Sequence, residues 1–348
     1  MNAQRSSDSV PVSSWRSARL FVTDEFAAPP VILRVDDSVI GTLGNFSAST
    51  GKAKSKKTFN VCAIVAAAMT GGTVLNYSAS LPPERRRVLY VDTEQSRFHC
   101  KRVLCRILRL AGLPTDAHPP LLEFLCLRGY ATKERLRKIE EAIYDLDDLG
   151  LVVIDGIRDL AHDINSPGEA TDLITKLMQW TDERRIHIHT VLHLNKGDDN
   201  TRGHLGTELN NKAETVLQIT KDDFDRDISS VAAMHIRDRD FEPFAFRINA
   251  DALPEQVEDY QLRQTTAAKS FDYAEVCEAK HREALELLFS KADRVSYSSL
   301  IGRLQSSYAA IGHSFGINKA KQLKVFLENK RMIVKEDKFY RYNPDFHY

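Results

Sequence analysis

The chain has 348 residues, enough for two domains, and its 43% hydrophobic and 28% charged residues are typical of a globular protein. Lysine and arginine balance aspartate and glutamate at 48 each, so the net charge does not indicate a polyanionic partner. The five cysteines form no CxxC pair, which argues against a disulfide framework or a zinc site. No apolar run reaches the roughly 20 residues that span a bilayer, so we expect a cytoplasmic protein without membrane contact.

The pattern of apolar residues predicts two domains. Residues 1–28 are predicted to be a flexible tail without the apolar segment of a signal peptide. Strand-like apolar runs alternate with helical patterns over 29–250, which predicts an α/β domain with a mostly parallel sheet flanked by helices. The predicted strands are 45–50, 88–91, 122–127, 151–154 and 186–194, with later strands at 213–220, 229–236 and 243–248 that predict an antiparallel extension. The predicted helices are 59–69, 97–111, 133–146 and 169–183.

The C-terminal part has a different pattern. Residues 251–272 are polar and lack an apolar period, so we expect a linker, and 273–348 form a second predicted domain. In this domain a β-hairpin with its turn at Asp337-Lys338 is predicted to follow three helices. The predicted helices are 275–290, 296–308 and 318–330. Helices followed by one basic hairpin indicate a winged-helix-like domain.

The loop between the 45–50 strand and the 59–69 helix is rich in lysine. Its sequence, Gly51-Lys-Ala-Lys-Ser-Lys-Lys-Thr58, has the form Gly-x-x-x-x-x-Lys-Thr. In a phosphate loop, backbone N–H groups and the helix N-terminus hold the phosphates of a nucleoside triphosphate, while the lysine reaches the β- and γ-phosphates and the hydroxyl ligates Mg²⁺. The predicted ligand-binding residues are Gly51, Lys54, Ser55, Lys56, Lys57 and Thr58.

One position departs from the usual phosphate-loop pattern, because Lys56 stands where glycine normally precedes the lysine. An alternative to a phosphate loop is therefore a basic surface loop that precedes a buried helix. The other frame, with Gly51-Lys52 as the Gly-Lys pair, has Ala53 where a hydroxyl is needed. If the frame that ends at Thr58 is correct, the loop either holds Lys56 in a non-glycine backbone conformation or is reshaped.

Two predicted strands end in carboxylates. Asp92-Thr-Glu94-Gln95 follows one strand, and Asp155 ends another. Beside a phosphate loop, a strand-terminal aspartate holds the water shell of Mg²⁺, which we expect of Asp155, although a simple polar turn at Asp155-Gly156 is the alternative. Glu94 is the expected general base for the attacking water; Asp92 is the alternative base, and helix capping is an alternative role for both.

The order of these motifs resembles that of the RecA-like ATPases over roughly residues 30–250. Within them, the chain looks most like the RepA-type and DnaB-type hexameric helicases, and its loop is similar to that of a RepA-like subgroup of bacterial mobile elements. The resemblance implies a RecA-like fold, Mg²⁺-dependent ATP hydrolysis coupled to DNA, and a homo-oligomer such as a hexamer. It also supports Glu94 as the catalytic base.

Several further roles follow from the resemblance. These ATPases place a γ-phosphate sensor at the end of the 186–194 strand, where His193 and Asn195 are the candidates. The segment from Arg202 to Leu209 is similar to their glycine-containing loop that faces the channel and DNA. His187 and His189 share a strand face, but no third ligand stands at a typical spacing, so we do not expect a metal there.

An arginine pair farther along the chain also matches the family. Arg237 and Arg239 resemble two basic residues that reach into the neighbouring subunit's site. On a strand these positions point the same way, and two such cations neutralise charge on the transferred phosphoryl group. The alternative is a solvated pair offset by Asp238 and Asp240.

The C-terminal domain carries ten lysine and arginine residues between Arg294 and Arg341 against three acidic ones. A basic helix and hairpin of this kind grip the DNA backbone, although protein contact is the alternative. The predicted DNA-contacting residues are Lys319, Lys321, Lys324, Lys335, Lys338 and Arg341.

These features favour an Mg²⁺-dependent ATPase that acts on DNA, as a helicase or helicase-like motor in plasmid or transposon replication or mobilisation. A nucleotide-gated DNA-binding regulator that does not unwind DNA is the second hypothesis. The third is a degenerate ATPase that binds nucleotide without turnover, which the substitution at Lys56 permits.

Overall fold

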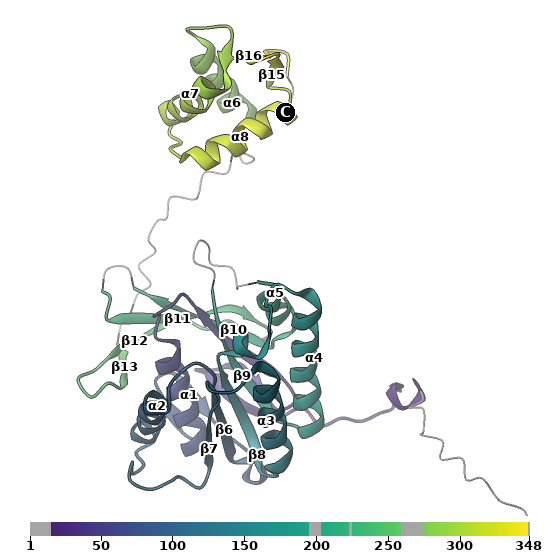
Figure 1. The fold of residues 1–348 in the computed structure, drawn as a ribbon, viewed down its shortest axis with the longest axis vertical. Helices are drawn as coiled ribbons and strands as arrows, with labels where there is room; N and C mark the ends of the chain where they lie inside the picture. The colour runs from purple at the N-terminus through teal and green to yellow at the C-terminus, as the bar shows by residue number, and fades with distance from the viewer. Residues whose placement is uncertain are drawn as a thin grey trace, which may run out of the picture. The chain divides into compact units, whose positions relative to one another are not determined.

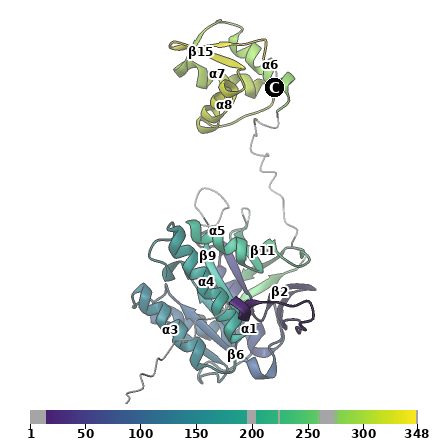
Figure 2. The same cartoon turned by 90° about the vertical axis from the view of Figure 1, so that its right-hand side faces the viewer.

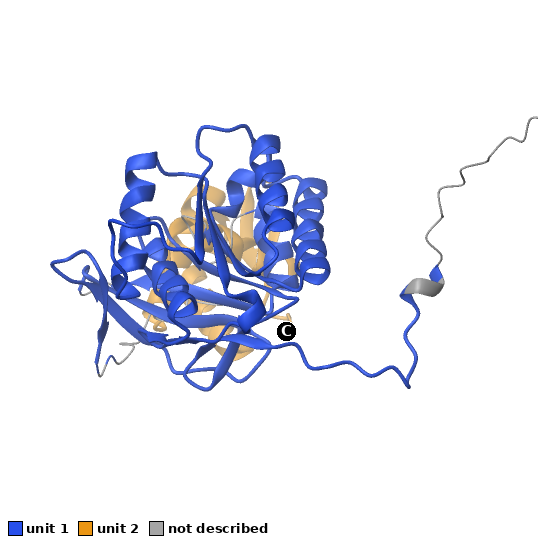
Figure 3. Ribbon diagram, turned by 90° about the horizontal axis from the view of Figure 1, so that it is seen from below, with its two compact units in different colours: residues 1–262 blue, residues 263–348 orange. Residues whose placement is uncertain are grey.

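The computed structural model describes residues 15–194, 203–222, 225–258, 260, 273 and 276–346. The chain divides into two compact units, residues 1–262 and 263–348, which Figure 3 shows in different colours. Each unit has its own hydrophobic core.

The first unit is built on a sheet with nine strands in the described residues, in the order β13-β12-β11-β10-β3-β9-β8-β6-β7 (Figure 1). Its parallel strands are β3 (Phe46–Gly51), β6 (Arg87–Asp92), β7 (Leu122–Cys126), β8 (Leu149–Asp155), β9 (His187–His193) and β10 (Thr215–Lys221). The antiparallel extension consists of β11 (Ile228–Ile236), β12 (Phe244–Ile248) and β13 (Pro254–Val257). The predicted α/β class, with a mostly parallel sheet flanked by helices, is confirmed.

Helices cover both faces of this sheet, because its strands are apolar on both sides. Val88 and Tyr90 pack with α1 (Lys57–Thr70) and α2 (Arg97–Leu110). The alternate residues, Leu89 and Val91, pack on the opposite face with the next helices along the chain. These helices, labelled in Figure 2, are α3 (Thr132–Asp145), α4 (Pro167–Arg184) and α5 (Gly203–Lys212).

A smaller sheet, in the order β2-β1-β5-β4, was not predicted from the sequence. Its strands are β1 (Val31–Val35), β2 (Ser38–Thr42), β4 (Thr73–Val74) and β5 (Tyr77–Ala79). Buried residues of β1 and β5 extend the core around α1. Three short 3₁₀ segments complete the unit: η1 (Trp15–Ala18), η2 (Pro83–Arg85) and η3 (Ile157–Leu160).

The first unit continues into the range 251–272, which was predicted to be a linker. Within that range β13 pairs with β12, and Pro254 lies opposite Ile248. The local sequence gave no apolar period because β13 is a short edge strand whose two central residues are exposed.

The second unit contains α6 (Glu278–Phe289), β14 (Val295–Ser296), α7 (Tyr297–Ala310), α8 (Ile317–Asn329), β15 (Ile333–Glu336) and β16 (Phe339–Tyr342). β14, β16 and β15 form an antiparallel sheet. The hairpin turns at Asp337-Lys338 as expected, with Asp337 at a φ of 52°. No helix in the described ranges of either unit combines the length and hydropathy needed to cross a membrane.

Candidate active site

The loop from β3 to α1 brings its backbone close to neighbouring atoms at Gly51. A Cβ at this position would meet the backbone oxygen of Ile219 and lie 2.5 Å from Ser55 Oγ, so only glycine fits. Lys54 and Lys56 have φ angles of 66° and 68°, in the left-handed region where a non-glycine residue costs about 1–2 kcal/mol. The loop therefore holds Lys56 in a glycine-like conformation instead of being reshaped around it.

The Lys56 side chain turns toward the β10–β11 hairpin. Its Nζ donates hydrogen bonds to the backbone oxygens of Asp227, at 2.5 Å, and Arg226, at 3.5 Å. Burial lowers the pKa of Lys56, while Asp227 opposes that shift. The ammonium thus fastens the loop to the hairpin, a contact that the sequence did not suggest.

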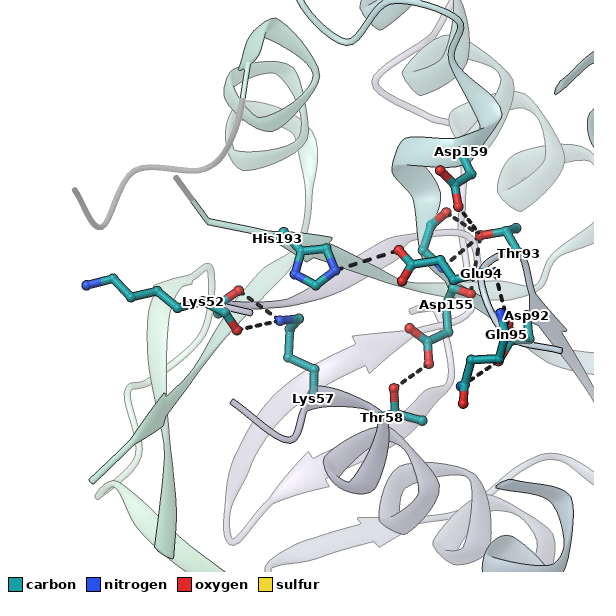
Figure 4. Close-up of polar contacts among 12 residues, drawn as sticks. Lys52, Lys57, Thr58, Asp92, Thr93, Glu94, Gln95, Asp155, Asp159 and His193 are labelled. Carbon is teal, nitrogen blue, oxygen red and sulfur yellow. Dashed lines mark hydrogen bonds and ion pairs between the residues drawn. The ribbon is translucent and has the colours of Figure 1, made fainter. Parts of the chain in front are cut away.

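Lys57 is buried, with 6% of its surface exposed, at the first position of α1. Its Nζ donates to the backbone oxygens of Gly51, at 2.8 Å, and Lys52, at 2.9 Å (Figure 4). Burial lowers its pKa to about 8, although the nearby carboxylates of Asp155 and Glu94 raise it. The ammonium is held by carbonyl groups of its own loop and by no carboxylate.

Asp155 lies at the end of β8, directly beside the start of α1. Its Oδ2 accepts hydrogen bonds from Thr58 Oγ1, at 2.8 Å, and from the Tyr90 hydroxyl, at 2.9 Å (Figure 4 shows the Thr58 bond). Burial raises the pKa of Asp155 to about 6, and the bond from Thr58 opposes this shift. The structure thus brings a hydroxyl and a carboxylate together, as the two motifs predict. Tyr90 was missed, although it is the one side chain in the VLYV strand with a hydroxyl.

Glu94 faces the same space from the turn after β6. Its Oε1 is 3.6 Å from His193 Nε2, and the imidazole is the main reason why the pKa of Glu94 is lowered. Gly156 makes room for the carboxylate, since a Cβ there would be 2.6 Å from Glu94 Oε1. His193 Nδ1 is buried and has no hydrogen-bond partner among the described residues. Asn195, the other sensor candidate, lies outside the described residues.

Asp92 is 1% exposed and shapes the turn that presents Glu94. Its carboxylate accepts hydrogen bonds from the backbone N–H groups of Glu94 and Gln95, at 3.0 and 2.7 Å, and from Gln95 Nε2, at 2.8 Å. Thr93 Oγ1 fastens the turn to β8 through the Gly156 oxygen, at 2.9 Å. Both carboxylate oxygens of Asp92 are thus engaged within the turn, and the N-cap of α2 is Ser96, so Asp92 holds the turn and does not cap the helix.

One cavity of about 370 Å³ between the loop and α2 is lined by Lys57, Thr58, Glu94, Asp155 and His193 among others. Arg102 and Arg106 of α2 form its far wall, and the Arg106 guanidinium lies 3.8 Å from the centre of the Phe59 ring. Neither arginine was predicted as a site residue from the sequence. Their four-residue spacing on the helix after Glu94 is a signal that could have identified them.

His187 and His189 are hydrogen-bonded core residues. Ser47 Oγ lies 2.7 Å from both His187 Nε2 and His189 Nδ1, and Ser49 Oγ lies 2.8 Å from His189 Nε2. Burial lowers the pKa of both histidines, that of His189 to about 3, so both rings are neutral. Their nitrogens are used by the protein itself, which leaves a structural role.

Arg237 and Arg239 do not lie on a strand as predicted, because β11 ends at Ile236. Ile236 pairs with Thr215 at the start of β10, while the phosphate loop adjoins the other end of that strand. At about 3.3 Å per residue, the two ends are roughly 20 Å apart. The arginines are exposed and lie at the wrong end of the sheet to reach the cavity of their own chain.

The expected DNA-facing loop from Arg202 to Leu209 is largely a helix. Gly203 begins α5, and Leu205 and Leu209 are buried against the sheet. The four-residue spacing of Leu205 and Leu209 is a helical pattern, which favours the observed helix over the expected loop. Arg202 lies outside the described residues.

The six basic residues predicted to contact DNA differ in availability. Lys324 is largely buried, with 15% of its side chain exposed; it pairs with Glu328 at 2.5 Å, and its Nζ lies 5.1 Å from the centre of the Tyr340 ring. Arg341 pairs with Glu336. Lys324 is therefore a structural residue of the second unit, contrary to the prediction. Three lysines are exposed: Lys321, Lys335 and Lys338.

Comparison with known proteins identifies the family. A family model described as AAA domain (AAA_25) matches residues 16–199, more than half of the chain. The chain is similar to the RadB recombinase structure at 17% identity, over 62% of this chain and 92% of that chain, with a TM-score of 0.45. It is similar to the KaiC-like protein PH0186 from Pyrococcus horikoshii OT3 at 14% identity, over 62% and 90% of the two chains, with a TM-score of 0.43. No curated protein matches. The match over residues 16–199 shows that the chain belongs to the AAA domain family, whose members are ATPases.

Proposed function

We propose that this chain is an Mg²⁺-dependent ATPase whose turnover is coupled to DNA, acting as a helicase or helicase-like motor in plasmid or transposon replication or mobilisation. The meeting of Lys57, Thr58 and Asp155 at one cavity, with Glu94 on its wall, carries the proposal. These groups come from three separate segments, which a basic surface loop would not bring together.

The residues fit ATP and Mg²⁺. The Thr58 hydroxyl and the Asp155 carboxylate are oxygen ligands of the kind that Mg²⁺ prefers, and they are already 2.8 Å apart. Ser55 Oγ is buried in the loop without a partner among the described residues, which suits a site completed by a ligand. Bound there, Mg²⁺ would neutralise charge on the β- and γ-phosphate oxygens.

The side chains of the cavity then have distinct tasks. Lys57 exchanges its two carbonyl partners for phosphate oxygens, and the loop N–H groups hold the rest of the phosphate chain. Glu94, whose pKa is lowered mainly by His193, accepts a proton from the attacking water. His193, next to Glu94 at the end of β9, reports the loss of the γ-phosphate to the segment that follows it.

Arg237 and Arg239 act on a neighbouring subunit. Because they lie roughly 20 Å along the sheet from their own cavity, they can complete a site only in a second copy. The working form is thus a homo-oligomer such as a hexamer. An isolated subunit is expected to hydrolyse ATP slowly, and Arg237→Ala is expected to reduce turnover without weakening ATP binding.

The second unit supplies DNA contact. Its order of helix, short strand, two helices and hairpin is winged-helix-like, and Lys321 on α8 and Lys335 and Lys338 on the hairpin are free to meet phosphates. Lys319 and Arg341 are weaker candidates because each already contacts another side chain.

A nucleotide-gated DNA-binding regulator is the second candidate, and the separate unit with its exposed lysines favours it. Strand displacement on a forked duplex distinguishes the two functions. The motor displaces the strand with ATP and loses this activity in Lys57→Ala. ATP-dependent binding of the intact protein without displacement would support the regulator, and absence of phosphate release with DNA present would support an ATPase that only binds nucleotide.

A further inference from the structure

α8 has two chemically different faces. Its buried face is apolar and consists of Ala320, Leu323 and Leu327. The opposite face is exposed, and its central residues follow one another at helical spacing of four, three and four residues. We call them the α8 stripe: Asn318, Gln322, Val325 and Asn329.

The described residues of the second unit make no use of the α8 stripe. The amides of Asn318, Gln322 and Asn329 form no hydrogen bond with another described residue, and Val325 is 50% exposed. Elsewhere on the same helix, Lys319 and Lys324 are held against aromatic rings. The stripe is therefore a set of amide and apolar groups that face solvent from a well-packed helix.

The charges around the α8 stripe suit a polyanion. The first turn of α8 has no acidic residue, and Glu328, the one acidic residue of the helix, is neutralised by Lys324. Lys321 lies beside the stripe, and the hairpin adds the exposed Lys335 and Lys338. A protein partner would not require cations on both the helix and the hairpin, whereas a duplex with phosphates on both sides of its groove does.

We propose that the α8 stripe contacts base edges in the major groove of double-stranded DNA, with a preference for adenine and thymine. The major groove admits an α-helix; asparagine and glutamine amides pair with N6 and N7 of adenine, and a small apolar side chain contacts the thymine methyl group. This assignment rests on the proposed DNA function and narrows it: the lysines hold phosphates, and the stripe selects the sequence.

A selection experiment tests the stripe. The full chain is mixed with a pool of randomised duplexes, and the bound DNA is sequenced. We expect one enriched motif with A·T pairs at separate positions. Gln322→Ala should relax the preference at one adenine position by roughly tenfold while leaving binding to the unselected pool nearly unchanged. Val325→Ala should do the same at a thymine.

Two controls separate this inference from the proposed function. Leu287→Ala on α6, at a position 49% exposed and so matched to Val325, should leave the motif intact. Lys335→Ala should weaken binding to every sequence and reduce its salt dependence by about one phosphate contact. Two outcomes would overturn the role of the stripe while DNA contact stands. One is binding of DNA without enrichment of any motif, as expected if the stripe contacts a protein. The other is enrichment of the parental motif by Gln322→Ala. Absence of binding to any DNA would overturn both.

Discussion

Two lysines with little exposure, one in each unit, show how differently the two regions of the molecule use charge. Lys57 in the phosphate loop is held by two backbone carbonyls, and burial lowers its pKa to about 8. For Lys324 on α8, burial also acts to lower the pKa, but Glu328 and Tyr340 outweigh it and the pKa is raised. The ammonium of Lys324 is thus locked in place, while that of Lys57 is available to a better partner.

The surroundings of the two lysines extend this contrast. Around Lys57, two residues have left-handed backbones, Ser55 Oγ lacks a partner among the described residues, and Asp155 is buried with a raised pKa. Strain and unsatisfied groups of this kind concentrate where a ligand binds. Replacement of a charged side chain at the phosphate loop should therefore reduce ATP turnover, whereas replacement of Lys324 on α8 should reduce the stability of the second unit.

The largest expected effect concerns Glu94. Glu94→Gln keeps the size of the side chain but removes the proton acceptor, so turnover should fall by about 10²–10⁴-fold while ATP binding persists. Phosphate release and nucleotide affinity, measured with Mg²⁺ and DNA, test this. Glu84→Gln in η2, outside the cavity, is the control. Unchanged turnover in Glu94→Gln would show that another group is the base.

The second prediction concerns Asp155 and pH. Its pKa in the folded state, about 6, lies above the ordinary 3.8. The contribution of the protonated side chain to the free energy of unfolding is therefore fully present below about pH 4 and is lost as the pH rises through 6. Without Mg²⁺, Asp155→Asn should therefore be more stable than the parent at pH 7, by roughly 3 kcal/mol at most, and equal to it at pH 4.

Denaturant titration at the two pH values, with and without Mg²⁺, measures the effect of Asp155→Asn. Mg²⁺ and ATP should stabilise the parent far more than the variant, because the variant lacks the carboxylate ligand. If the difference in the free energy of unfolding between Asp155→Asn and the parent is the same at pH 4 and pH 7, ionisation of the buried carboxylate does not destabilise the fold.

The sequence predicted the main sheet well because its strands are continuous apolar runs between helices of regular period. Gly51, Lys57, Thr58 and Asp155 could be selected from the sequence because the chemistry of phosphate binding restricts both residue type and position. Tyr90, Arg102 and Arg106 were missed because they belong to an apolar strand and an amphipathic helix, where one polar side chain is unremarkable until the fold places it beside the loop.

The errors have the same physical origin. Glu328 stands four residues after Lys324 on the same helix, so their ion pair could have been read from the sequence. The two aromatic rings beside Lys324 come from other elements, and only the three-dimensional packing brings them there. Arg237 and Arg239 were placed on a strand because β11 has no breaking residue before them. The end of a strand depends on its partner, here Thr215 at the start of β10, which local sequence does not encode.

The third prediction tests the locked lysine. Lys324→Ala removes an ion pair and two ring contacts, which should destabilise α8 by about 1 kcal/mol. Lys321→Ala, on an exposed position of the same helix, should stay within about 0.5 kcal/mol of the parent. Native-state hydrogen exchange of α8 amides compares the two variants. Equal protection in both would mean that the contacts of Lys324 do not stabilise the helix.

The smallest effect, and the finest test of the contrast, is expected at Lys56. Lys56→Gly relieves the left-handed backbone, which is worth about 1–2 kcal/mol. It also removes the hydrogen bonds to the hairpin and adds unfolded-state entropy, which together cost about 1–2 kcal/mol, so the net change in the free energy of unfolding should be small. Lys56→Ala keeps the strain and loses the same bonds without adding that entropy, so it should be less stable than Lys56→Gly by up to about 1 kcal/mol. Denaturant titration ranks them. ATP turnover of Lys56→Gly should change far less than that of Lys57→Ala, because the Lys56 ammonium faces Asp227. If both variants lost turnover to a similar extent, the Lys56 ammonium would instead contact the phosphates.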